Sequence, residues 1–214
     1  MLTIHAADLL LPGDPRRPSV PGGAVVVAGR EVAAVGPYEE LAARNPTARV
    51  RRWPGLIAPG LRNPYGPELL EQAYHPDPRE AAELGTEPLT GDVLAGLAMT
   101  EARWGASARR GVQRMLAHGT VAVAGALRRP AVVDAVHRAG LATEERFADP
   151  PGRACLDPLA GRSLAEAVPT PLPLPGAEAT FAVFDAPDEA ALTTRGAACC
   201  VATVVAGRLV HRRR

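Results

Sequence analysis

Residues 57–67 read Ile57-Ala58-Pro59-Gly60-Leu61-Arg62-Asn63-Pro64-Tyr65-Gly66-Pro67. The apolar run that enters this stretch predicts a short strand, and Pro59-Gly60 predicts a break after it. Further prolines follow, so no long helix or strand is expected directly beyond this point. The stretch therefore predicts a strand that leads into an irregular segment carrying Asn63 and Tyr65.

The residues before this stretch predict a small, sheet-rich unit. Residues 2–11 have the composition of a strand, and residues 24–27 and 32–36 form a hairpin candidate rich in valine. Gly29 supplies the positive φ that the hairpin turn requires. Residues 38–45 predict a short helix, and a further strand through Val50 and Trp53 leads back to the opening stretch.

The middle of the chain predicts an α/β passage. Prolines dominate residues 62–91, where we expect loop with one short helix near 68–74. Asp92 can cap a helix whose apolar face runs from Leu94 to Leu116, and Gly119 ends it. A buried strand over 120–124 and a helix from Pro130 to Gly140 follow, with another strand near 141–147.

The last third returns to strands. Residues 148–179 are rich in proline and glycine and are expected to cross the surface in extended form, apart from a short helix capped by Ser163 with Glu166. Residues 179–185 and 199–205 predict two strands, and Ala206-Gly207-Arg208 turns the chain into a final one. No internal repeat is visible.

The order of these pieces resembles the amidohydrolase superfamily, and within it imidazolonepropionase and aminodeoxyfutalosine deaminase. The resemblance is carried by motifs spread over both ends of the chain: Ala7-Asp8, Pro12, the hairpin Gly23 to Gly36, Glu40-Leu41, Pro59-Gly60-Leu61-Arg62-Asn63, Met115-Leu116-Ala117-His118-Gly119-Thr120, Pro175-Gly176-Ala177 through Asp185, and Val201 through Val210. Each motif alone is a weak signal, whereas their order is moderately specific.

The resemblance implies an α/β fold with two parts. Residues 1–58 and 176–214 would form a composite β-sandwich, and residues 59–175 a region similar to a TIM barrel. A complete (β/α)₈ barrel takes about 250 residues, but only about 115 lie between Pro59 and Gly176. We therefore expect a truncated barrel remnant of two or three βα units.

The resemblance also implies a metal site, and here the sequence departs from the pattern. The family motif P-G-L-x-N-x-H-x-H places two metal-binding histidines after the strand. This chain keeps Asn63 but has Tyr65 and Pro67 at the two histidine positions. Phenol is a poor metal ligand and proline has no side-chain donor. Asn63, Tyr65 and Pro67 are thus degenerate metal-site positions, and we expect the Tyr65 ring to fill the vacated space.

One other group of residues could hold a metal. His75, Asp77 and Glu80 form the only compact group of donors in the sequence, and zinc requires about three such ligands. They lie in a proline-rich loop, where solvated side chains are the simpler reading. His118 is expected to interact with the end of its helix, and His5 to occupy an edge or half-exposed position on a strand.

Composition narrows the remaining choices. The chain has 24 arginines and 23 acidic residues, and this nearly balanced charge predicts no nucleic-acid partner. It has no lysine, which excludes a carboxylated lysine as a metal ligand. Three cysteines without paired spacing favour a reducing cytoplasm. No apolar run approaches the ~20 residues of a membrane span, so no membrane partner is expected.

Three functional hypotheses remain. The leading one is an imidazolonepropionase-like amidohydrolase relative that has lost its metal site and acts as a binding or accessory protein. This hypothesis assigns no catalytic residue and no cofactor. The open barrel of such a protein would favour a homodimer. The alternative is a zinc-dependent hydrolase or deaminase acting on non-peptide C–N bonds of a small cyclic substrate. The third is a partner subunit of a full-length relative.

Overall fold

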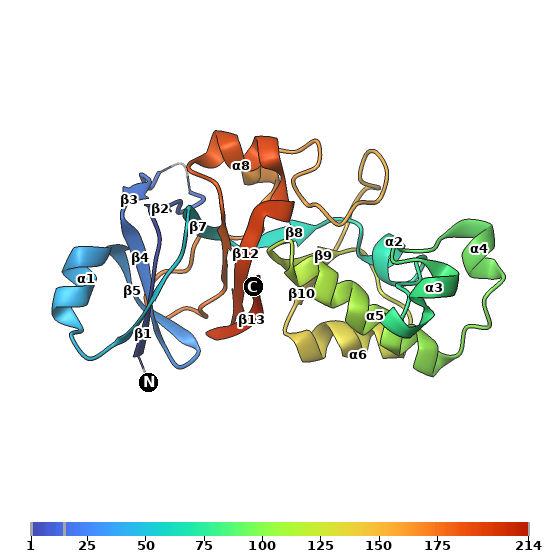
Figure 1. Cartoon of the computed structure of the whole chain (residues 1–214). Helices are drawn as coiled ribbons and strands as arrows, with labels where there is room; N and C mark the ends of the chain where they lie inside the picture. The colour runs from blue at the N-terminus through green and yellow to red at the C-terminus, as the bar shows by residue number, and fades with distance from the viewer. Residues whose placement is uncertain (1, 15, 214) are drawn as a thin grey trace.

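Sheet A lies at the N-terminal end of the molecule (Figure 1). The computed structural model describes residues 2–14 and 16–213. Four strands pair in the order β5-β4-β1-β6. Their bounds, with the helix α1 that covers one face, are β1 (Leu2–Ala6), β4 (Gly23–Ala28), β5 (Glu31–Pro37), α1 (Tyr38–Arg44) and β6 (Arg49–Arg52). The predicted hairpin is confirmed as β4 and β5, which pair antiparallel around Gly29 at φ +62°.

Sheet B joins the two ends of the chain. Its six strands pair in the order β13-β12-β11-β7-β2-β3. They are β2 (Leu9–Leu10), β3 (Val20–Pro21), β7 (Leu56–Pro59), β11 (Phe181–Phe184), β12 (Cys200–Val205) and β13 (Arg208–Arg212), with α8 (Glu189–Arg195) and the short helix η2 (Ala197–Cys199) between β11 and β12. The strand predicted from residue 199 thus begins one residue later, because Cys199 belongs to η2.

Sheets A and B pack face to face as a β-sandwich. Valines of β4 contact aromatic and aliphatic side chains of β7, β11 and β12, and none of these side chains is exposed to a significant extent. Inward-facing side chains of two stacked sheets form such a core because alternate residues of each strand point to the same side. The composite sandwich predicted from the two chain ends is therefore confirmed.

Sheet C is the remnant of the barrel. Three parallel strands, β8 (Leu61–Asn63), β9 (Thr120–Ala124) and β10 (Ala142–Glu144), pair in the order β10-β9-β8. The helices of this region are α2 (Gly66–Leu70), η1 (Pro78–Glu80), α3 (Ala81–Leu84), α4 (Gly91–Ala95), α5 (Glu101–Leu116), α6 (Pro130–Ala139) and α7 (Leu164–Ala167). Parallel strands joined through α5 and α6 are βα units, so the predicted partial barrel is also confirmed.

The prediction of one long helix beginning at Asp92 was wrong. Two helices, α4 and α5, stand in its place. Thr100 is the N-cap of the second, and its hydroxyl accepts a hydrogen bond from the backbone N–H of Arg103 at 3.2 Å. A threonine side chain competes with the helical backbone for hydrogen bonds, and Gly96 weakens the connection before it. The apolar spacing continued through this break, which is why periodicity alone missed it.

The sandwich and the βα units form a continuous body. Val205 and Ala206, at the end of β12, pack with α5 and α6, and the Thr203 hydroxyl donates to the carbonyl of Leu116 at 2.6 Å. Gly119 lies so close to Phe184 of sheet B that an added Cβ would sit 2.7 Å from the ring. Among the described helices, none combines the length and the apolar character needed to cross a membrane.

Candidate functional site

The candidate site lies at the carboxyl edge of sheet C, where the loops after parallel strands converge. β8 ends at Asn63, which is fully buried. Its amide nitrogen donates to the carbonyls of Cys155 at 2.9 Å and Leu156 at 3.3 Å, while its Oδ1 accepts from the backbone N–H of Tyr65 at 2.9 Å. Asn63 therefore holds the loop of residues 151–156, here called the covering loop, over the end of the strand.

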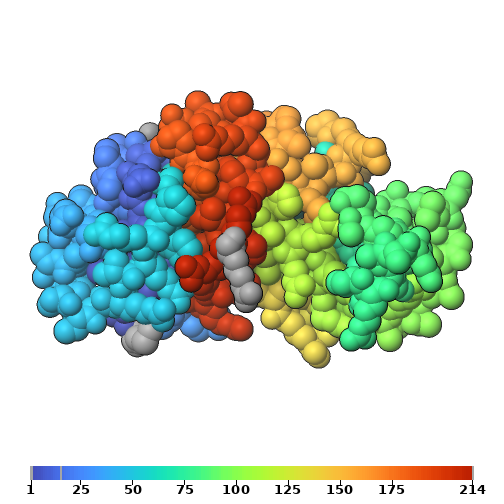
Figure 2. All heavy atoms as spheres, in the orientation of Figure 1, coloured from blue at the N-terminus to red at the C-terminus, as the bar shows by residue number. Residues whose placement is uncertain are grey.

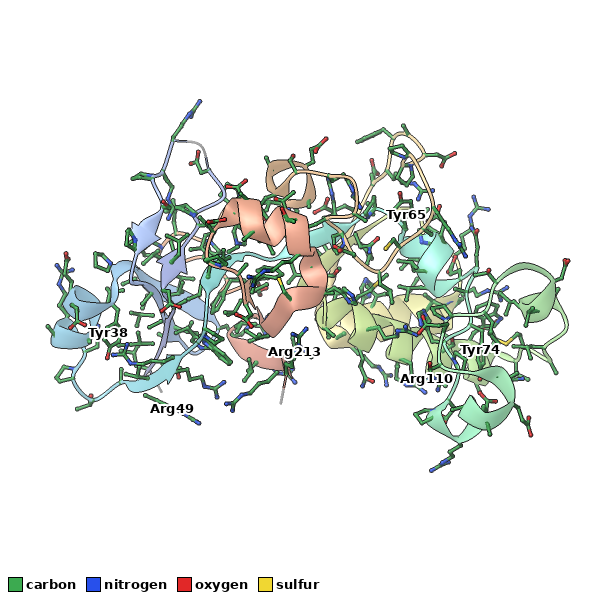
Figure 3. The ribbon with its side chains drawn as sticks, turned by 45° about the horizontal axis from the view of Figure 1, so that its top comes forward. Tyr38, Arg49, Tyr65, Tyr74, Arg110 and Arg213 are labelled. Carbon is green, nitrogen blue, oxygen red and sulfur yellow. The ribbon has the colours of Figure 1, made fainter. Side chains whose placement is uncertain are left out.

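Tyr65 is held in place at both ends of its side chain. The ring is only 6% exposed and packs with apolar side chains of α2, α5 and β9. Its hydroxyl donates to the carbonyl of Pro151 at 2.5 Å, and the Arg162 guanidinium lies 5.7 Å from the ring centroid. Figure 3 labels Tyr65 beside the loop that covers it. A phenol donating to a carbonyl in this way is a packing and hydrogen-bonding element.

Pro67 is buried at the start of α2, a position that proline favours because the missing N–H has no helical partner there. Its ring lies against Gly125, the residue after β9, where an added Cβ would come within 2.6 Å of the proline Cδ. Tyr65 and Pro67 are thus both packed side chains.

Two ion pairs tie the loops of this edge together. Arg62 of β8 lies 3.3 Å from Glu144 of β10, and Arg146 lies 2.8 Å from Glu68 of α2. Arg146 also donates to the carbonyl of Pro64 at 3.0 Å. These four charged side chains are about two-thirds to four-fifths buried. No local feature of the sequence indicates these pairs, because their members lie about 80 residues apart.

His75, Asp77 and Glu80 do not converge. His75 is buried, with Nε2 2.8 Å from the carbonyl of Leu69, and its pKa is lowered by burial. Asp77 and Glu80 instead form a capping box at η1, in which the Asp77 N–H donates to Glu80 at 3.0 Å. The structure thus brings the two carboxylates together and directs the imidazole elsewhere.

The two carboxylates are also engaged by arginines of α5. Arg110 lies 3.3 Å from Asp77, and Arg103 lies 2.8 Å from Glu80. The buried Tyr74 hydroxyl donates to Glu80, which holds the pKa of that carboxyl below its usual range. Figure 3 shows Tyr74 and Arg110 on facing elements of this network. The network fastens the loop after α2 to α5, and across residues 2–14 and 16–213 no three His, Cys, Asp or Glu side chains are grouped to hold a metal ion.

The prediction for His5 was wrong. His5 is 3% exposed, lies in a central position of sheet A and stacks on Trp53, whose indole N–H donates to its Nδ1 at 3.2 Å. Burial, followed by the charge of Arg51, lowers the pKa of His5 to about 4. His118 follows the end of α5, and its Nδ1 lies 2.8 Å from the carbonyl of Arg114. It therefore interacts with the C-terminal end of this helix, as expected from the sequence.

A cavity of about 710 Å³ opens beside the candidate site. It lies between α2, the loop before α4 and the covering loop, and it is lined by Glu68, Leu69, Gln72, Ala73, Glu87, Pro88, Thr90, Gly91, Arg153, Ala154, Cys155 and Leu156. This volume falls in the range of small-molecule pockets, and its wall mixes apolar side chains with a few polar groups, as such pockets do.

The imidazolonepropionase-like composite domain of bacteria is the family whose model matches this chain, over residues 23–48. These residues are β4, β5 and α1 of the sandwich. No curated protein sequence matches the chain.

Several solved structures align with it. Ochratoxinase from A. niger is 21% identical, with 69% of this chain and 32% of that protein covered and a TM-score of 0.47. A zinc-bound adenosine deaminase from Xanthomonas campestris is 17% identical, with 66% and 32% covered and a TM-score of 0.49. Aminofutalosine deaminase from Helicobacter pylori is 12% identical, with 68% and 33% covered and a TM-score of 0.43. The chain spans about a third of the length of these proteins. Residues 23–48 are thus similar to an imidazolonepropionase-like composite domain of bacteria.

Proposed function

We propose that this chain is a non-catalytic amidohydrolase relative that serves as a binding or accessory module. The observation that supports it is the packing of Tyr65, which fills the carboxyl edge of sheet C and donates to Pro151 where the resemblance implies metal ligands. Pro67 occupies the second position without any donor atom. The proposal takes the cytoplasm as its location, which three free cysteines favour.

The binding role has a place in the structure. The cavity of about 710 Å³ adjoins the covering loop, so a small ligand in it would contact residues 153–156 and α2. Asn63 fixes this loop through Cys155 and Leu156, which keeps that wall of the cavity in position. A preformed wall reduces the ordering cost of binding.

Metal content tests the proposal directly. The purified, untagged protein is expected to contain far less than one equivalent of zinc, iron or nickel per chain by elemental mass spectrometry. The double variant Tyr65→His/Pro67→His is expected to gain no measurable zinc affinity, because two imidazoles in a packed edge still lack the third ligand. About one equivalent of zinc in the native protein would contradict the proposal and favour a hydrolase or deaminase acting on non-peptide C–N bonds of a small cyclic substrate.

The proposed partner is a second copy of this chain, with a full-length relative as the alternative. β10 is an edge strand of sheet C, and Phe147 just beyond it is 94% exposed. An open strand edge next to an exposed aromatic ring is a common place for association between chains.

Replacing Phe147 with serine is expected to convert a dimer to a monomer at micromolar concentration, because the ring would lose its apolar contact. Light scattering after size exclusion measures this. Leu174→Ser is the matched control, since Leu174 is also exposed, at 60%, but lies outside sheet C. A wild-type protein that is already monomeric, or equal effects of both variants, would remove the dimer from the proposal; co-purification with a full-length relative would support the alternative.

A further inference from the structure

Two open sheet edges meet on one flank of the sandwich. β6 is the last strand of sheet A and β13 is the last strand of sheet B. In Figure 2 the cyan segment that contains β6 lies beside the red C-terminal strand. The two edges are joined by a contact, because the guanidinium carbon of Arg212 lies 5.7 Å from the ring centroid of Trp53, the residue after β6.

Strand register places three arginines at this junction. Arg51 pairs with His5 in parallel register, so the two side chains share the face that points into the sandwich, and Arg49 shares it by alternation. His5 itself is buried there, 5.2 Å from the Phe181 ring. On the other sheet, Arg212 pairs with Ala202, a core residue of the same sandwich. Arg49, Arg51 and Arg212 therefore lie along the edge where the two sheets meet, and this group is here called the arginine mouth; Figure 3 labels Arg49.

Among the residues that the structure describes, no carboxylate forms an ion pair with the arginine mouth. Nine other arginines form ion pairs within 4.0 Å: Arg30, Arg44, Arg62, Arg103, Arg110, Arg114, Arg129, Arg138 and Arg146. In the part of the chain that the structure describes, Arg49, Arg51 and Arg212 form no such pair. Burial, and then the neighbouring charges of Arg49 and Arg212, lower the pKa of Arg51. Like charges held together in this way are stabilised by a bound anion.

We propose that the arginine mouth binds the phosphate group of a small anionic ligand. Guanidinium groups present planar, paired N–H donors that match phosphate oxygens, and several of them on one surface can engage one group together. A phosphate carries more charge than a single carboxylate and so compensates more of the three positive charges. The mouth belongs to the sandwich and does not involve Tyr65, so this inference does not depend on the proposed function of the chain.

The experiment titrates inorganic phosphate and pyrophosphate into the full chain at low ionic strength by isothermal titration calorimetry. The wild type is expected to bind saturably, and the triple variant Arg49→Gln/Arg51→Gln/Arg212→Gln is expected to bind at least tenfold more weakly. The matched control is Arg44→Gln/Arg79→Gln/Arg138→Gln, which removes three exposed arginines and the same net charge from other surfaces. It is expected to bind as the wild type does.

The remaining outcomes are decisive in either direction. Tighter binding of pyrophosphate than of phosphate supports the proposal and identifies a diphosphate-bearing ligand; equal binding supports a single phosphate group. No saturable binding by the wild type, or equal weakening in the two triple variants, would overturn it. If the triple variant fails to fold by circular dichroism, Arg51→Gln alone must still weaken binding at least threefold for the proposal to stand.

Discussion

Replacing Asn63 with leucine is expected to lower the free energy of unfolding by about 3–5 kcal/mol. The side chain is fully buried and satisfies the carbonyls of Cys155 and Leu156 and the N–H of Tyr65. Leucine has nearly the same shape but no polar atoms, so the buried N–H of Tyr65 and the partly buried carbonyls of Cys155 and Leu156 would lose their partners. Each such group costs about 1–3 kcal/mol, and the covering loop would separate from the strand end as well.

Urea unfolding of the variant and the wild type measures this effect. Asn45→Leu is the control, because the Asn45 amide donates to the carbonyl of Leu41 at 2.9 Å but is only partly buried at the end of α1. A loss below about 1 kcal/mol is expected there. Similar losses in both variants would show that Asn63 does not have a special role in holding the loop.

Acidification from pH 7 to pH 4 is expected to remove about 3 kcal/mol of stability through His5 alone. The pKa of His5 is about 4 in the folded protein against 6.5 for a free imidazole. Below pH 6.5 the unfolded chain binds a proton that the folded chain does not, so stability is complete above this pH and is lost as the pH falls toward 4. The buried imidazole of His75 acts in the same direction.

Unfolding curves at several pH values between 4 and 7 test this dependence. His5→Gln is the informative variant, because glutamine can still accept the hydrogen bond from Trp53 but does not titrate. It is expected to flatten the pH profile by about 3 kcal/mol over this range. His137→Gln, on the exposed side of α6, is expected to keep the wild-type profile. Retention of the full pH dependence in His5→Gln would contradict the assignment.

Much of the fold was predictable because its signals are local. Valine-rich segments around Gly29 predicted the hairpin, and Ser163 with Glu166 predicted a capping box that the structure contains. The motif order predicted that both chain ends form one sandwich. The break before Thr100 was missed because apolar periodicity continues through it, and a threonine cap competes with that signal only weakly.

The sequence allowed residues of the candidate site to be proposed, but it did not reveal their surroundings. Asn63 and Tyr65 were identified from a motif, yet their partners in the 151–156 loop lie about 90 residues away and leave no periodic trace. The same holds for His5, whose burial depends on strand register and on Trp53. Arg103 and Arg110 of α5 meet Glu80 and Asp77 only in the folded chain, and no sequence spacing encodes these two ion pairs.

The pairing of β7 sets the order in which the molecule can be assembled during synthesis. β7 pairs with β2 on one side and with β11 on the other, and β11 begins about 120 residues later in the chain. Contacts over such separations form slowly, and a nascent chain cannot make them before the later partner has left the ribosome. Until residue 181 emerges, the apolar edge of β7 is open to other strands, so chaperone dependence and aggregation are concentrated in this interval of translation.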